Sequence, residues 1–498
     1  MTNKTRHNWI KPKSFDNNII VIGGGSAGLV TSYIAAAVKA KVTLIEKHRM
    51  GGDCLNTGCV PSKALISTTR LLANATRAKE FGIAKMTAEY EFSDVMERVQ
   101  SVVKAIEPHD SVERYQNLGV DVIKGNARII SPWEVEVTTA TGTQTLTTLA
   151  IVIAAGARPL VPPILGIENI DYLTSDTVWS LRIQPNRLIV LGGGPIGCEL
   201  AQCFARLSSK VTMVEMASRL LIREDEDASG LVLEQFEKEG IDVRLGHTAK
   251  QFIVENSEKL LLVEHEGNTI RIPFDAILLA LGRSPNTSGY GLEDIGVELS
   301  PKRAIQIDGF QATNYPNIFA CGDVSGPYQF THTAAHQAWY AAVNALFGNI
   351  KKFRTDYSVI PWATFTEPEV ARVGLNEQEA NEQGIKYEVS KYDIAGLDRA
   401  IADGNAHGFV KVLTKPGKDK ILGVTIVGDH AGDLVAEFVL AMKHGIGLNK
   451  ILGTIHIYPT LAEANKYVAG VWKKNHQPEK LLQWIARYHA WRRGEKEK

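Results

Sequence analysis

The stretch NIIVIGGGSAGLV, residues 18–30, is the strongest indication of fold class in this chain. An apolar strand leads directly into Gly23, Gly25 and Gly28, a helix-forming stretch follows, and a second strand ends at Glu46. The first glycine makes the turn, the second lets the backbone approach a pyrophosphate, and the third lets the helix pack on the strand. The helix N-terminus favours phosphate, and the acid accepts hydrogen bonds from a ribose. This unit predicts an α/β domain that binds a dinucleotide.

The same unit recurs in RLIVLGGGPIGCE, residues 187–199. Its glycines are Gly192, Gly194 and Gly197, and the strand after its helix ends at Glu215. In both copies the acid follows the first glycine by 23 residues, so the copies match in register. Two such units in one chain imply two bound dinucleotides.

The acid of the second unit bears on the choice between the two nicotinamide cofactors. Glu215 would hydrogen-bond a ribose 2′-OH and repel a 2′-phosphate, which favours NADH over NADPH. Arg219 lies four residues further on and would soften this preference, so NADPH stays open.

Between the two units stands GGDCLNTGCVPSK, residues 51–63, with four residues between Cys54 and Cys59. A disulfide here would close a very small ring, and strained disulfides tend to be catalytic rather than structural. Gly52 lets the backbone approach a flat ligand closely, and Pro61 indicates a helix start, whose N-terminus favours a thiolate. The alternative is two ordinary buried cysteines. The dinucleotide unit just before this stretch favours the redox interpretation.

Two further segments have the pattern of crossings between the units. IVIAAGARP, residues 151–159, is an apolar strand followed by a turn of small residues at Gly156. DAILLALGRSPNT, residues 275–287, repeats this pattern at Gly282. A third apolar strand, IFACGDV, ends at Asp323, whose carboxylate is a suitable acceptor for the ribityl hydroxyls of a flavin.

Composition excludes several classes of protein. Lys and Arg number 55, as do Asp and Glu, so no overall charge favours nucleic acid. The polar N-terminus lacks the apolar region of a secretory signal, and no stretch of about 18 uncharged apolar residues predicts a transmembrane helix. Five cysteines in 498 residues do not make a disulfide framework, which favours a reducing cytoplasm. Cys198, Cys203 and Cys321 are predicted to pack in the core.

The motifs GGGSAG, GGDCLNTGCVPSK, GGGPIGCE, ALGRSPNT, ACGDV and PTLAE together resemble the flavin-dependent pyridine nucleotide–disulfide oxidoreductases. Dihydrolipoamide dehydrogenase, glutathione reductase and mercuric ion reductase are members. The resemblance covers about residues 18–470. It implies an α/β fold like that of glutathione reductase, with two Rossmann-like dinucleotide-binding domains and a C-terminal α+β dimerisation domain. It also implies FAD and NADH as cofactors.

The resemblance implies four parts and a homodimer in which each active site borrows residues from the partner. The parts are an FAD-binding domain with the redox disulfide (1–156), an NAD-binding domain (157–285), a central FAD-contacting segment (286–356) and an interface domain (357–498).

The resemblance also implies roles for single residues. Cys54 would be the interchange thiol that faces the substrate, and Cys59 the thiol that forms a charge-transfer complex with the flavin. Lys63 and Glu199 would form an ion pair beside flavin N5. His332 would lie where a helix end meets the flavin pyrimidine. The implied cofactor contacts are Gly23, Gly25, Gly28, Glu46, Gly52, Lys63, Gly156, Gly192, Gly194, Gly197, Glu215, Gly282, Asp323 and His332.

One position departs from the pattern of the disulfide reductases. In HIYPTLAEAN, residues 456–465, Tyr458 stands directly before the proline, where those enzymes have a His paired with the Glu. Glu463 remains, but a tyrosine with a pKa near 10 is a poor general base at neutral pH. The LDRAIADG stretch is more similar to the mercuric reductase branch. However, no cysteine follows Cys321 and no N-terminal CxxC domain is present, so no metal-ligand set is predicted.

The function predicted is an FAD-dependent NAD(P)H oxidoreductase. It would pass electrons through Cys54 and Cys59 to a metal ion such as Hg(II), a quinone or a small electrophile. Tyr458 and Glu463 are candidate catalytic residues. The alternative is a dihydrolipoamide dehydrogenase of a multienzyme complex. An alternative of another class is a non-catalytic flavoprotein redox sensor.

The C-terminal stretch 478–493 is predicted to form an amphipathic helix. Its apolar face contains Leu481, Trp484, Ile485, Tyr488 and Trp491, and its basic residues are Lys480, Arg487, Arg492 and Arg493. This helix would either pack on the dimer or lie on an anionic membrane. In the second case a cytoplasmic enzyme would contact the inner membrane face peripherally.

Overall fold

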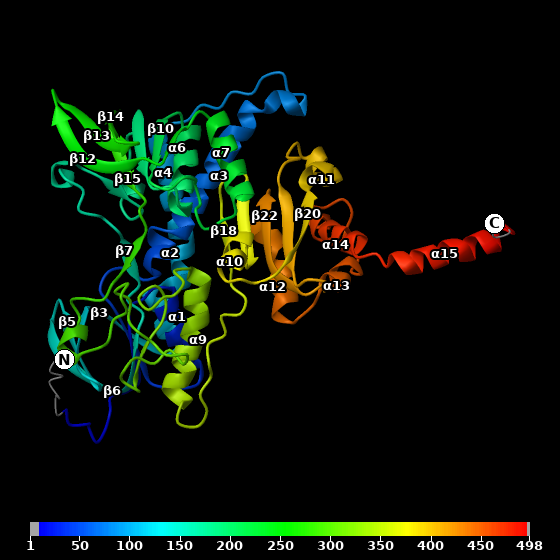
Figure 1. Ribbon diagram of the computed structural model, residues 1–498. Helices are drawn as coiled ribbons and strands as arrows, with labels where there is room; N and C mark the ends of the chain where they lie inside the picture. The colour runs from blue at the N-terminus through cyan, green and yellow to red at the C-terminus, as the bar shows by residue number, and fades with distance from the viewer. Residues whose placement is uncertain (1–8, 496–498) are drawn as a thin grey trace. The chain divides into compact units, whose positions relative to one another are not determined.

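The computed structural model describes residues 9–495 and divides into two compact units (Figure 1). The first unit contains the chain up to Lys79, Ala84–Ser218 and Phe236–Asp356. The second contains Glu80–Ile83, Arg219–Gln235 and the chain from Tyr357 onward. Each unit has its own sheets and its own core.

The first sheet of the first unit has the order β3-β2-β1-β6-β5-β4, with β17 beside β6. Its strands are β1 (Asn17–Ile22), β2 (Val42–Glu46), β3 (Val120–Lys124), β4 (Asn126–Ser131), β5 (Glu134–Thr139), β6 (Gly142–Ile153) and β17 (Ile318–Ala320). The strands β3, β2, β1, β6 and β17 are parallel, while β4, β5 and β6 form an antiparallel meander. After two asparagines, residues 19–22 of strand β1 are apolar and buried, because both faces of the parallel sheet are covered.

Helices α1 (Ser26–Ala37) and α9 (Thr331–Phe347) lie side by side against this sheet, as Figure 1 shows. Helix α1 starts directly after Gly25, so the strand, glycine turn and helix predicted from the sequence are present. The second strand ends at Glu46, as expected. The first dinucleotide-binding unit is thus confirmed as a fold element.

The second parallel sheet has the order β11-β10-β9-β15-β8. Its strands are β8 (Leu173–Thr174), β9 (Arg187–Leu191), β10 (Lys210–Glu215), β11 (Asp242–Leu245) and β15 (Ala276–Leu279). Helix α6 (Pro195–Arg206) follows β9, so the second glycine unit is also confirmed. An antiparallel sheet of β12 (Thr248–Glu255), β13 (Glu258–His265) and β14 (Asn268–Phe274) shares a core with it.

The two predicted crossings pair with each other. Strand β7 (Ala157–Pro159) is antiparallel to β16 (Arg283–Pro285). Gly156 and Gly282 stand directly before these strands with φ of 65° and 105°, a region that favours glycine. The sequence indicated each crossing separately, and the tertiary structure joins them.

The remaining elements of the first unit connect or cover these sheets. They are α2 (Gly52–Asn56), α3 (Cys59–Thr76), α4 (Phe92–Ile106), α5 (Val112–Asn117), α8 (Leu292–Ile295) and the short helices Glu107–Asp110, Ile167–Asn169 and Val178–Ser180. A further short helix, Ala78–Phe81, begins in this unit and ends in the second. Helix α4 buries Phe92, Met96, Val99 and Val103, and this spacing gives one apolar face that packs near α3.

The second unit is built on an antiparallel sheet of order β18-β19-β22-β21-β20. Its strands are β18 (Pro361–Thr364), β19 (Glu369–Gly374), β20 (Glu388–Asp393), β21 (Phe409–Thr414) and β22 (Ile421–Gly428). Its helices are α10 (Glu377–Glu382), α11 (Asp398–Ala402), α12 (Ala431–Lys443), α13 (Leu448–Leu452), α14 (Glu463–Asn475), α15 (Glu479–Arg492) and the turn Ile394–Gly396. The core lies between the sheet and α12 and α14, which confirms the α+β fold expected for this part.

Residues 219–235, with most of α7 (Glu226–Lys238), join this unit through buried charges. The Lys411 ammonium is 2% exposed and lies 2.8 Å from Asp225, Asp227 and Glu377. A buried charge is tolerated only when it is paired, so these contacts hold the segment on the sheet. The sequence placed this segment inside a domain of residues 157–285; those domain boundaries stay a prediction.

Candidate active site

The stretch with the two cysteines packs directly on the first glycine turn. Gly51 and Gly52 have φ of 86° and 57°, and Cys54 follows on α2. A Cβ on Gly52 would come within 2.6 Å of the Cα of Gly25. Only glycine allows this approach, so the structure joins two motifs that are separate in the sequence.

Cys54 and Cys59 are free thiols in the structure, and their sulfur atoms share a hydrogen bond. The thiol of Cys54 donates to Cys59 and lowers the pKa of Cys59 to about 6. The Thr331 hydroxyl, 3.4 Å from the Cys59 sulfur, and the charge of Lys63 act in the same direction. The same hydrogen bond, together with burial, raises the pKa of Cys54. At neutral pH Cys59 is therefore a thiolate and Cys54 a thiol.

The backbone supports this division of charge. Cys59 is the first residue of α3, an 18-residue helix, and a helix N-terminus stabilises a thiolate. Thr331 is the first residue of α9. Sequence reasoning missed Thr331, and its only signal was its position directly before the predicted His332. The His332 ring stacks on Phe330 with 5.3 Å between ring centroids.

The predicted ion pair is present. Lys63 Nζ lies 2.8 Å from Glu199 Oε2, and the side chains are 38% and 8% exposed. Lys63 comes from α3 and Glu199 from α6, which pack together. The pair thus links the cysteine helix to the second glycine unit. Its role beside a flavin stays a prediction.

Asp110 was not predicted, yet it lies beside the cysteines. A Cβ built on Gly51 would come within 3.1 Å of Asp110 Oδ2. The negative charge of Asp110 contributes to the raised pKa of Cys54, and burial raises the pKa of Asp110 itself. A single sequence gave no signal, because Asp110 is more than fifty residues from Cys54.

The glycine turns fit the pyrophosphates of two dinucleotides. A Cβ on Gly23 would meet the Ala154 carbonyl oxygen at 2.4 Å, and one on Gly192 would meet the Ala280 oxygen at 2.5 Å. A Cβ on Gly194, in contrast, would have no neighbouring heavy atom within 4 Å. Gly23 and Gly192 are required by packing, while Gly194 leaves space for a phosphate. In the first turn, a Cβ on Gly25 would lie 3.7 Å from the Cα of Gly52.

The third glycines pack their helices against the turns. A Cβ on Gly28 would meet the Gly23 oxygen at 1.8 Å, and one on Gly197 would meet the Gly192 oxygen at 2.0 Å. Both helix N-termini therefore stay close to the turns and can bind phosphate.

The two acids hold equivalent positions. Glu46 accepts hydrogen bonds from the backbone N–H groups of Gly24 and His48, each at 2.6 Å. Glu215 accepts from those of Gly193 and Ala217 at 2.6 and 2.7 Å. Each carboxylate has about four lone-pair positions, so both can still accept from ribose hydroxyls. The residues around the Gly23 turn fit FAD, and those around the Gly192 turn fit a nicotinamide dinucleotide.

Asp323 shares an arginine with the cysteine stretch. Arg283, from β16, lies 3.5 Å from Asp323 and also forms an ion pair with Asp53 on α2. Burial raises the pKa of Asp323. Arg283 therefore ties the crossing strand to both predicted cofactor-contacting segments, a role that sequence reasoning missed.

The other three cysteines are buried, as predicted. Cys198 and Cys203 lie on α6, and Cys321 lies in the core beside β17. Burial raises the pKa of each thiol, so none is a nucleophile at neutral pH.

Tyr458 and Glu463 belong to the second unit, where they bond to different partners. The Tyr458 hydroxyl donates to Asp398 Oδ2 at 2.9 Å, and this bond raises the pKa of the phenol. Glu463 is buried and accepts from the Tyr467 hydroxyl at 3.2 Å. Asp398 belongs to the LDRAIADG stretch and was not predicted as a site residue. The phenol therefore stays protonated at neutral pH and can donate a proton but not accept one.

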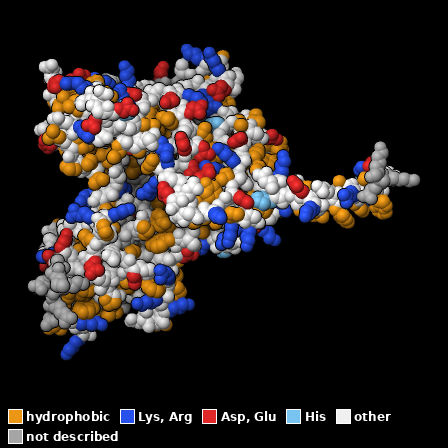
Figure 2. Space-filling view, viewed as in Figure 1, with side chains coloured by type: hydrophobic (Ala, Val, Ile, Leu, Met, Phe, Trp, Pro, Cys, Tyr) orange, Lys and Arg blue, Asp and Glu red, His pale blue; other side chains and the backbone are white. Residues whose placement is uncertain are grey.

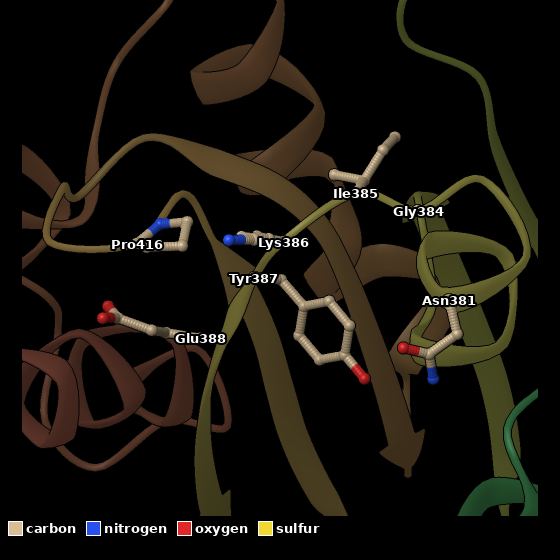
Figure 3. Close-up of a pocket in the computed structure, with 7 residues that line it drawn as sticks. All are labelled: Asn381, Gly384, Ile385, Lys386, Tyr387, Glu388 and Pro416. Carbon is tan, nitrogen blue, oxygen red and sulfur yellow. The ribbon is translucent and has the colours of Figure 1, made fainter.

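A separate hollow of about 540 Å³ lies on the second unit, lined by Asn381, Gly384, Ile385, Lys386, Tyr387, Glu388 and Pro416 (Figure 3). None of these residues is a predicted site residue. The Tyr387 hydroxyl donates to Glu377, which also binds Lys411. We therefore assign this side chain to the buried charge cluster.

Fold and site together define an enzyme with two dinucleotide sites and a redox-active cysteine pair. Residues 17–338 match the family model "Pyridine nucleotide-disulphide oxidoreductase". Residues 360–469 match the dimerisation domain of the same family. The chain belongs to the pyridine nucleotide-disulphide oxidoreductases, an enzyme family that binds FAD and NAD(P)H.

Curated relatives fall into two groups by name. The dihydrolipoyl dehydrogenase of Chlamydia muridarum is 34% identical over 447 residues, which are 89% of this chain and 94% of that protein. The mercuric reductase of Lysinibacillus sphaericus is 33% identical over 458 residues, covering 92% and 83%. The chain is nearly equally similar to both, so sequence identity alone does not indicate which electron acceptor it uses.

Solved structures confirm the fold. The Cu(II) complex of the HOCl-induced flavoprotein disulfide reductase RclA from Escherichia coli superposes with a TM-score of 0.81 at 26% identity. The superposition covers 91% of this chain and 99% of the RclA chain. LpdA from Mycobacterium tuberculosis gives 0.82 at 26% identity, with the same coverage. The glutathione reductase-like fold inferred from the sequence is thus confirmed.

Proposed function

We propose that this flavoenzyme passes electrons from NADH through Cys54 and Cys59 to an oxidising metal ion, a quinone or a small electrophile. The observation that carries the proposal is the Tyr458 phenol, which stands before Pro459 and is bonded to Asp398. An enzyme that exchanges thiols with a substrate disulfide needs a base at this stage, and a protonated phenol is not one.

The protonation state of the cysteine pair supports the first half of the reaction. When bound, FAD would relay the reducing equivalents of the nicotinamide to the cysteine pair. A hydride equivalent carries two electrons and one proton. Delivered to a disulfide, it breaks the S–S bond and leaves one thiolate and one thiol. The environment of Cys59 and Cys54 stabilises this product without a further proton.

The second half differs between acceptors. A substrate disulfide must be attacked by Cys54, whose thiol must first lose its proton. A metal ion takes two electrons as the disulfide re-forms, and the Cys54 proton leaves to solvent. A quinone takes two electrons and two protons, of which Cys54 supplies one and a protonated Tyr458 can supply the other. A protonated phenol is compatible with the last two acceptors, because neither of them requires a base at this position.

A panel of acceptors tests this proposal. We expect NADH-dependent turnover with quinones or Hg(II) and very weak turnover with lipoamide or glutathione disulfide. Tyr458→His should raise disulfide turnover, because a positioned base contributes about 10²–10⁴-fold. Tyr458→Phe is the matched control: it removes the hydroxyl without adding a base, and flavin reduction by NADH should be unchanged. Fast lipoamide reduction by the unmodified enzyme would contradict the proposal.

The second candidate is a dihydrolipoyl dehydrogenase of a multienzyme complex, which the 34% identity to such enzymes favours. It predicts that lipoamide is the best acceptor in the panel. A non-catalytic redox sensor would show no steady-state turnover with any acceptor.

The preference for NADH over NADPH is supported by Glu215 and the contacts of the nearby Arg219 in the sequence. Glu215 would accept from a ribose 2′-OH and repel a 2′-phosphate. Arg219, the candidate phosphate partner, donates to the carbonyl oxygens of Ile222 and Glu224 at 3.1 and 3.2 Å. One nitrogen of its guanidinium, Nη2, is therefore already engaged.

We further propose a homodimer that shares its active sites, supported by the match to the dimerisation domain. Ile455 and Ile457 are 96% and 78% exposed beside Tyr458, as expected of a surface that a second copy covers. We also propose a cytoplasmic location, supported by the low cysteine content of five in 498 residues, and peripheral membrane contact is argued below. Light scattering should give twice the chain mass of 54.6 kDa.

A further inference from the structure

The last helix of the described chain, α15, buries none of its 14 residues. Figure 1 shows it extending away from the sheet of its unit, and Figure 2 shows hydrophobic side chains along it. Trp484 and Trp491 are 63% and 70% exposed. Large aromatic side chains at this exposure mark an interaction surface.

The aromatic residues form one ordered stripe. The rings of Trp484 and Tyr488 stack with 6.2 Å between centroids, and those of Tyr488 and Trp491 lie 6.1 Å apart. Leu481 and Ile485 fall on the same face at helical spacing. Tryptophan and tyrosine are the side chains that prefer the boundary between lipid tails and headgroups.

The charge of this segment differs from that of the rest of the chain. Residues 473–498 contain eight Lys and Arg but three Glu, whereas the whole chain has no net charge. Between residues 480 and 494 there is no acidic residue. Lys480 and Arg487 lie two helical turns apart along one edge of the stripe, where their stems can cover apolar surface and their charges reach anionic groups.

A second copy of the chain is the competing occupant. The match to the family's dimerisation domain ends at residue 469, ten residues before α15 begins, so α15 lies outside the domain through which the family dimerises. Two α15 helices packed by their stripes would bring basic residues together without carboxylates between residues 480 and 494 to pair them. Such an arrangement is disfavoured by repulsion between like charges.

We propose that α15 binds the surface of a membrane rich in anionic phospholipid. The helix lies in the plane of the interface, with the stripe of Leu481, Trp484, Ile485, Tyr488 and Trp491 between the headgroups and its basic residues on the phosphates. Within residues 9–495 no helix has the length and apolarity needed to cross a bilayer, so the contact is peripheral. Binding does not depend on which acceptor the enzyme uses.

Co-sedimentation of the FAD-loaded full-length protein with vesicles tests the proposal. The vesicles contain either phosphatidylcholine alone or an equal mixture of phosphatidylcholine and phosphatidylglycerol. We expect binding to the mixture, little binding to phosphatidylcholine, and a loss of binding as salt is raised, because electrostatic attraction to the surface is screened.

Three variants separate the parts of the helix. Trp484→Ala combined with Trp491→Ala should weaken binding by about tenfold for each tryptophan. Arg487→Gln should weaken it about fivefold. Ala486→Gln is the matched control on the opposite face and should bind like the unmodified protein. All variants should keep NADH-dependent flavin reduction, which shows that the enzyme is folded.

Equal binding to both vesicle types, or unchanged binding of the double tryptophan variant, would overturn the proposal. Light scattering of the same variants tests the competing explanation, that a second copy of the chain covers the stripe. If the double variant loses a self-associated state and the unmodified protein binds neither vesicle type, α15 is an interface between copies, and the membrane proposal is wrong.

Discussion

The hydrogen bond between Thr331 and Cys59 gives the sharpest test of the reaction centre. The Thr331 hydroxyl lies 3.4 Å from the Cys59 sulfur, and it is one of the causes that lower the pKa of Cys59 to about 6. Thr331→Val keeps the shape of the side chain and removes the donor. A thiolate that loses a donor is less stable, so the pKa of Cys59 should rise.

The size of the shift follows from the contact. A hydrogen bond to a charged group contributes about 1.5–3 kcal/mol, and one pKa unit corresponds to about 1.4 kcal/mol. The contact is long at 3.4 Å, which places the effect at the low end of this range. We expect the pKa of Cys59 to rise by about one unit in Thr331→Val.

The assay is a pH titration of the two-electron-reduced holoenzyme, followed by its long-wavelength charge-transfer absorbance. The thiolate gives the band, so its midpoint should move to higher pH. Thr333→Val is the matched control, because Thr333 lies on the same helix and donates to the Phe330 carbonyl. Glu199→Gln should move the midpoint in the opposite direction, since the charge of Glu199 raises the pKa of Cys59. An unchanged or lower midpoint in Thr331→Val would refute the reasoning.

Three further predictions follow from the same site. Cys59→Ser should abolish the charge-transfer band while FAD stays bound, and a band of undiminished strength would show that the wrong thiol is assigned. Glu215→Ala should narrow the difference in kcat/KM between NADH and NADPH; comparable values in the unmodified enzyme would contradict the preference. Asp110→Asn should speed alkylation of Cys54 at a given pH, because the charge that helps raise its pKa is lost. Peptide mapping by mass spectrometry measures this rate, and an equal or slower rate argues against a role for Asp110.

Those parts of the protein that have local sequence signals could be predicted before the structure was known. The two glycine turns could be recognised because Gly23 and Gly192 need backbone conformations and close contacts that other residues do not tolerate. The cysteine pair and the amphipathic helix of residues 478–493 were equally readable, because spacing over a few residues fixes which side chains share a turn or a face. The fold class followed from the order of these parts.

Contacts between residues that are distant in the sequence could be identified only in the folded structure. Thr331 is 272 positions from Cys59, and Asp110 approaches Gly51 from another helix. Tyr458 bonds to Asp398, 60 positions away, rather than to the nearby Glu463. Each contact depends on how whole helices and sheets pack, because close packing of these elements fixes where their side chains meet. Spacing along one chain does not encode this arrangement.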